Sequence, residues 1–129
     1  MNINVRVIKH KEQRYETVGD WVYNPANTLL TVFVSDMGDW RYNQLVAVHE
    51  IAEATLCIER GINEKDVTAF DLWYESERLK NNPECQSEPG DHKKAPYRKE
   101  HFCATTIERM LAAELGVDWE DYDTTVNSL

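Results

Sequence analysis

The 129-residue sequence is poor in cysteine, and the three cysteines that it has are widely spaced. Cys57, Cys85 and Cys103 form an odd set and contain no C-x-x-C pair. A disulfide framework needs an even set of paired cysteines, and a cysteine-rich zinc knuckle needs closely spaced pairs. The sequence therefore argues against both kinds of small fold, and we expect free thiols.

The sequence also lacks a long apolar run and an excess of basic residues. No stretch approaches the roughly 20 apolar residues of a membrane span, and residues 1–6 have neither the basic nor the apolar region of a signal peptide. The 23 acidic residues outnumber the 14 basic residues and give a formal net charge of -9. Nucleic acids and anionic membranes both bind basic surfaces. We therefore expect a cytoplasmic protein with no nucleic-acid partner and no membrane partner.

The beginning of the chain has the pattern of a small sheet. Ile3, Val5 and Val7 alternate with polar residues, which is the two-residue period of a half-buried strand. β-Branched and aromatic residues are frequent in 15–23 and 28–35, and turn-forming residues lie between these two segments. The pattern predicts about three strands, which we expect to pair as an antiparallel sheet.

Three later stretches have the apolar spacing of helices. Asp39 is a predicted N-cap for the first of them, and Asp118 for a last short helix near the end of the chain. The sequence thus predicts an α+β fold in a single domain, with a small N-terminal antiparallel sheet packed against three main helices. The expected parts are a sheet in 1–36, a helix in 40–60, a helix in 64–80, a loop in 81–96, a helix in 97–115 and a tail in 116–129, in which a short helix around 119–122 is followed by a frayed end.

The helix expected at 40–60 is apolar on almost every side but carries His49, Glu50 and Glu53 at its centre. A buried charge without a partner is costly, so such residues are usually paired or bound to a metal. Residues four apart share one face of a helix, so His49 and Glu53 can reach the same point in space. Imidazole nitrogen and carboxylate oxygen are both zinc ligands, and a zinc site needs at least a third ligand from elsewhere.

We prefer His101 as the third ligand, because it lies on the core-facing side of the last long helix. Asp71, Asp91 and His92 are alternative third ligands. Asp71 is an acid among apolar residues of the middle helix, while Asp91 and His92 lie in the long loop and can close over the site. Glu108 is a candidate hydrogen-bond partner for a ligating histidine.

The strand expected at 31–35 and the following His49-Glu50-x-x-Glu53 helix resemble the edge strand and active helix of zincin-like metallopeptidases. The resemblance covers residues 29–61. It implies that His49 binds zinc and that Glu50 is the general base of a hydrolase whose substrate is a peptide, another amide or a small molecule. In that family a second histidine lies four residues after the first, where this chain has Glu53.

Two other functions remain open at this point. The segment His49–Ala54 is also similar to metal phosphohydrolases of the HD type, although that family has an aspartate where this chain has Glu50. Alternatively, a metal only stabilises the fold. The last alternative is an interaction module without metal, in which His49 is bonded to a carboxylate and Glu50 and Glu53 lie on a solvated edge. The overall pattern also resembles short proteins of bacterial and phage origin.

Overall fold

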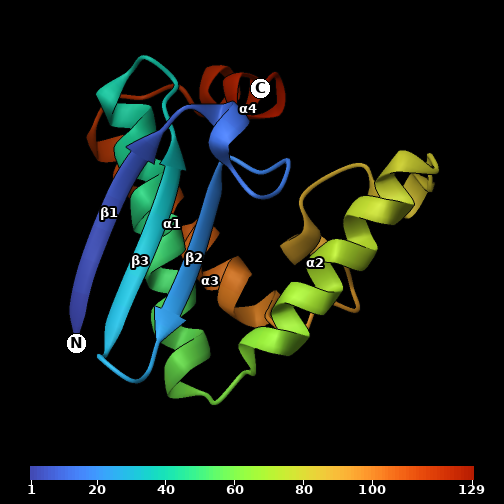
Figure 1. Ribbon diagram of the computed structural model, residues 1–129. Helices are drawn as coiled ribbons and strands as arrows, with labels where there is room; N and C mark the ends of the chain where they lie inside the picture. Colours follow the sequence, from blue (N-terminus) through green and yellow to red (C-terminus); the bar gives the residue numbers. More distant parts are fainter.

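The computed structural model describes residues 1–129 as a three-stranded sheet with four helices (Figure 1). This arrangement confirms the expected α+β class. The strands are β1 (Asn2–Ile8), β2 (Gly19–Asn24) and β3 (Leu29–Ser35), and the helices are α1 (Trp40–Glu59), α2 (Glu64–Leu79), α3 (Arg98–Glu114) and α4 (Trp119–Asn127). Three short 3-10 helices, η1 (His10–Glu12), η2 (Pro83–Cys85) and η3 (Pro89–Asp91), lie in the connections.

The sheet is mixed, so the expectation of purely antiparallel pairing was wrong. Its strand order is β1-β3-β2, and β1 pairs in parallel with β3 while β2 pairs with β3 in the antiparallel sense. The connection through η1 carries the chain past β3, so that β2 begins on the far side and returns as a hairpin into β3. Alternating apolar residues have the same period in both kinds of pairing, and for this reason the sequence pattern could not distinguish them.

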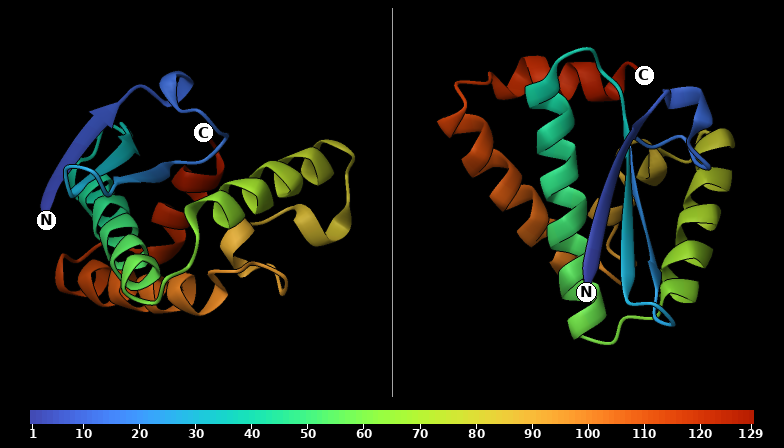
Figure 2. Two further views of the ribbon diagram at one scale, coloured as in Figure 1. Left: turned by 60° about the horizontal axis from the view of Figure 1, so that its bottom comes forward. Right: turned by 60° about the vertical axis from the view of Figure 1, so that its left-hand side comes forward.

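One face of the sheet forms the core with α1. Leu30, Val32 and Val34 on β3 are fully buried, and Trp21 on β2 is nearly so. Figure 2 shows α1 lying between the sheet and α3, so that its two sides face different partners. One side of α1 is therefore a packing face for the sheet, and the other is free to carry polar groups toward α3.

The three predicted long helices begin and end within one residue of their expected limits. Asp39 caps α1, as predicted, by accepting a hydrogen bond from the backbone N–H of Arg41. The segment 81–96 is the expected long connection, and it contains η2 and η3. None of the helices combines the length and the apolar character that crossing a membrane requires.

The last part of the chain is more ordered than the frayed tail that we expected. Asp118 caps α4 as predicted, but α4 continues to Asn127 instead of ending near residue 122. Tyr122 is 2% exposed, and its ring packs edge-on against Tyr42 of α1 at 5.1 Å between centroids. This contact ties α4 to α1 and explains why the segment remains helical.

Candidate metal centre

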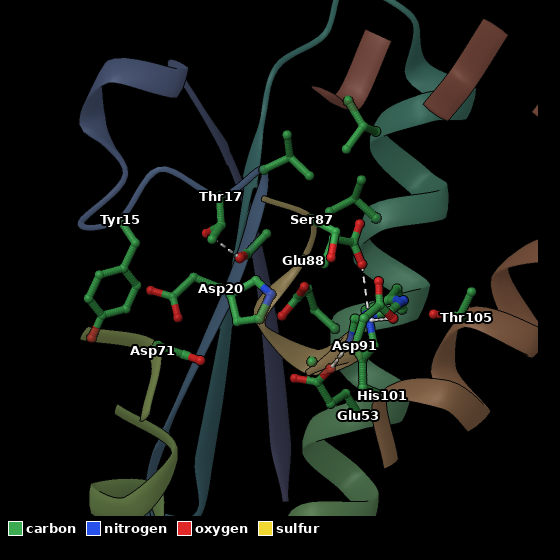
Figure 3. Close-up of a pocket in the computed structure, with 18 of the residues that line it drawn as sticks. Tyr15, Thr17, Asp20, Glu53, Asp71, Ser87, Glu88, Asp91, His101 and Thr105 are labelled. Carbon is green, nitrogen blue, oxygen red and sulfur yellow. Dashed lines mark hydrogen bonds and ion pairs between the residues drawn. The ribbon is translucent and has the colours of Figure 1, made fainter. Parts of the chain in front are cut away.

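Three ligand-type side chains from α1 and α3 meet in the interior. His49 and Glu53 lie one turn apart on α1, and His101 approaches them from α3; all three are buried. The Nε2 atom of His49 lies 3.3 Å from Oε2 of Glu53 and 3.2 Å from Nδ1 of His101. His101 Nδ1 lies 2.8 Å from the same Glu53 oxygen. The three residues preferred from the sequence are thus brought to one point, and Figure 3 shows Glu53 and His101 of this group side by side.

The triangle formed by these three atoms has the size of one face of a metal coordination shell. A tetrahedral zinc ion with bonds of about 2.0 to 2.1 Å holds its ligand atoms about 3.3 Å apart. Two of the three separations match this value, and the third, from His101 to Glu53, is the length of an imidazole–carboxylate hydrogen bond. The donor set therefore fits a divalent ion with little movement.

His49 is held in the orientation that a ligand needs. Its Nδ1 lies 2.8 Å from Oε1 of Glu108 on α3, and Tyr122 of α4 donates its hydroxyl proton to the other Glu108 oxygen at 2.5 Å. A carboxylate behind a histidine fixes the tautomer and directs the opposite ring nitrogen toward the metal. Glu108 thus takes the position suggested for it from the sequence, and α4 supports it from behind.

Glu53 is oriented in a similar way by the sheet. The indole N–H of Trp21 on β2 donates to Oε1 of Glu53 at 3.1 Å. This bond occupies one carboxylate oxygen and leaves Oε2 facing the two histidines. Local pattern could not assign this role to Trp21, because an aromatic residue in a buried strand has the same pattern when it only packs.

The buried charges shift the pKa values of the three groups strongly. Burial lowers the pKa of His49, but hydrogen bonds to Glu108 and Glu53 outweigh it and raise the value to about 10. Burial likewise lowers the pKa of His101, and its carboxylate neighbours raise it to about 12. Burial raises the pKa of Glu53, but bonds from both histidines lower it to about 2. The centre therefore holds protons tightly where a cation would otherwise bind.

Negative charge is in excess around the centre. Five carboxylates, those of Glu50, Glu53, Glu88, Asp91 and Glu108, face two imidazole rings, and no lysine or arginine forms an ion pair with any of the five. Carboxylates outnumber the rings even when both rings are protonated and one carboxyl is neutral. A cluster of carboxylates whose members are mostly buried or half-buried is stabilised by a bound cation, because the cation offsets their mutual repulsion.

Glu50 is half-buried and lines a cleft of about 610 Å³ beside the centre. Its side chain lies against Gly19 of β2, where a Cβ atom would approach Oε1 of Glu50 to 2.5 Å, so a larger residue at this position would displace the Glu50 carboxyl group. Burial raises the pKa of Glu50 well above its usual value, and the charge of Glu53 adds to the effect. A bound divalent ion would act in the opposite direction.

The alternative third ligands lie elsewhere. Asp71 on α2 accepts a hydrogen bond from the hydroxyl of Tyr97 at 2.5 Å and stands across the cleft from Glu53 (Figure 3). Burial raises the pKa of Asp71 to about 7. His92 is enclosed by the rings of α2, and its Nδ1 accepts from the N–H of Lys94. Neither residue joins the three-residue group.

Asp91 does approach the centre, but from the outer side of His101. Its Oδ1 lies 3.4 Å from His101 Nε2, and Oε2 of Glu88 lies 3.0 Å from the same nitrogen. The sequence analysis did not identify Glu88. An acidic residue in a polar loop looks like any solvated surface charge, and only the path of the folded loop brings it inward.

Comparison of the chain with protein-family models, curated proteins and solved structures found no match. The resemblance to zincin-like enzymes therefore remains an expectation from the motif. The arrangement of His49, Glu53 and His101, together with the groups around them, is therefore what indicates a function.

Proposed function

We propose that this protein binds a divalent metal, most simply zinc, through His49, Glu53 and His101, and that it is a zincin-like metallohydrolase acting on a peptide or another amide. The observation that supports metal binding is the convergence of three buried ligand atoms within 3.3 Å of one another, in surroundings with an excess of carboxylates. His49 and Glu53 are also oriented from behind, by Glu108 and by Trp21, as ligands of a functional metal usually are.

A zinc ion in such a site polarises a carbonyl group and makes a bound water more acidic. Glu50 follows the first ligand directly and faces the cleft, so it is the group available to take a proton from the attacking water and return it to the leaving nitrogen. The carboxylate ligand Glu53 lowers the net charge of the centre compared with a third histidine. We therefore expect weaker activation of water than in an all-histidine site.

The position of the edge strand β2 beside the cleft favours an extended substrate. β2 is an edge strand that pairs only with β3, and Gly19, Asp20 and Trp21 of β2 line the cleft. An extended peptide can add to a free strand edge through main-chain hydrogen bonds. Asp71 lies across the cleft from the metal ligands with a pKa of about 7, so it can exchange protons with a substrate near neutral pH.

A non-catalytic centre, in which the metal only joins α1 to α3, is the second candidate. The raised pKa of Glu50 favours it, because a neutral carboxyl group cannot accept a proton. The phosphohydrolase alternative has less support, since β1, β2 and β3 occupy the region where that family carries a helical histidine.

The test combines metal analysis with one conservative substitution. Protein purified without added metal should contain zinc by mass spectrometry, and Glu50→Gln should retain the zinc but lose hydrolysis of a peptide mixture. Glu59→Gln, on the exposed end of the same helix, is the matched control. Zinc-loaded wild type that cleaves no peptide would favour the non-catalytic centre, and turnover by Glu50→Gln equal to wild type would refute the catalytic role.

A further inference from the structure

His101 presents both of its ring nitrogens to ligand-type atoms. Nδ1 faces the inner centre, and Nε2 on the opposite edge of the ring faces the carboxylates of Glu88 and Asp91, at 3.0 and 3.4 Å. His101 is 6% exposed, and its buried Nε2 atom has no hydrogen-bond partner, although it lies at ion-pair distance from both carboxylates. A buried nitrogen that is close to two carboxylates but bonded to neither calls for another partner.

Close packing of the loop backbone places these two carboxylates beside the His101 ring. Glu88 immediately precedes the short helix η3 and Asp91 is its last residue, and Gly90 between them packs directly on His101. A Cβ atom at position 90 would lie 2.2 Å from Cγ of the His101 ring, so only glycine permits this approach. The position of the two acids is therefore set by close packing of the backbone.

Hydrogen bonding within the protein does not satisfy these groups. Glu88 and Asp91 form no ion pair other than those with His101. One N–H cannot donate fully to two carboxylates, and the two acids repel each other as long as both are ionised. Their side chains are 46% and 57% exposed, so water and ions can reach the oxygens from the cleft.

We propose that Glu88, Asp91 and Nε2 of His101 form a second divalent-cation subsite, joined to the first through the His101 ring. Two carboxylates and one imidazole suit zinc or manganese, with water completing the shell. When only one subsite is filled, the other ring nitrogen keeps its proton. When both are filled, the ring bridges the two ions as imidazolate, and its last proton is released to the solvent.

The experiment measures zinc stoichiometry by equilibrium dialysis of metal-stripped protein. Wild type should bind two equivalents, and the double variant Glu88→Gln/Asp91→Asn should bind one. Glu84→Gln is the control, because Glu84 lies in the same segment but faces His92 and Lys93, and it should keep two. Saturation of wild type at one equivalent, with the same single equivalent in the double variant, would overturn the proposal and leave the two acids as orienting partners of His101.

A second variant separates this inference from the function proposed above. Glu53→Gln removes a ligand of the inner site only, since Glu53 contacts Nδ1 and not Nε2 of His101. It should retain one equivalent of zinc, and Glu88→Gln/Asp91→Asn combined with it should retain none. Wild type can also bind a single zinc that Glu53→Gln retains and Glu88→Gln/Asp91→Asn loses. In that case the outer subsite exists without the inner one.

Discussion

Binding of the first metal ion should release two protons, one from each histidine of the centre. In the metal-free protein the pKa of His49 is raised to about 10 and that of His101 to about 12, so both rings are protonated at neutral pH. A ligating imidazole must give up the proton from the nitrogen that binds the metal. The apparent affinity should therefore rise about 100-fold for each pH unit between about 7 and 9, which corresponds to about 2.7 kcal/mol per unit.

The measurement is competition with a chromophoric chelator at limiting zinc, so that only the tighter site fills. It is best made with the Glu50→Gln variant, because the raised pKa of Glu50 would otherwise add a third proton. Calorimetry in buffers of different ionisation enthalpy counts the released protons independently. With the outer subsite removed by Glu88→Gln/Asp91→Asn, a slope of one proton would refute the reasoning, because it would mean that His49 and His101 share a single proton across their 3.2 Å contact.

Three further outcomes follow from the same geometry. Glu108→Gln removes the carboxylate behind His49 and should weaken zinc binding about 10- to 100-fold by chelator competition, while the exposed α3 variant Glu114→Gln should not. Both histidine pKa values are raised in the folded state, so their contribution to the free energy of unfolding of the metal-free protein is fully present below a pH of about 6.5 and should be lost as the pH rises toward about 10. An unchanged urea midpoint over this range would contradict the assignment. Trp21→Phe leaves Oε1 of Glu53 without its donor and should lower the free energy of unfolding by about 2 kcal/mol in urea titrations.

The helices and the convergence of His49, Glu53 and His101 could be predicted from the sequence because each depends on local spacing. The four-residue interval between His49 and Glu53 determines that they share a helix face, and the apolar neighbours of His101 place it toward the core. The limits of α1 follow from Asp39, which caps the helix through its own side chain. These features need no knowledge of the rest of the chain.

Features that depend on how distant segments of the chain meet in the fold could not be predicted in the same way. The parallel pairing of β1 with β3 depends on how the η1 connection crosses the sheet, and strand periodicity does not record it. Glu88 reaches His101 only because Gly90 lets the loop backbone approach the ring. Tyr122 supports Glu108 only because α4 folds back onto α1 and α3. In each case the deciding contact lies outside the local pattern.

The separation of the ligands along the chain determines when the centre can form during synthesis. His49 and His101 are 52 residues apart, and His49 and Glu108 are 59 apart. While a ribosome is still making α3, a nascent chain has only the His49–Glu53 pair on α1, which is too few ligands for tight capture of zinc. If the centre binds zinc as proposed, metal uptake would come after the packing of α1 on α3, and a bound ion would mark chains that have already reached the folded state.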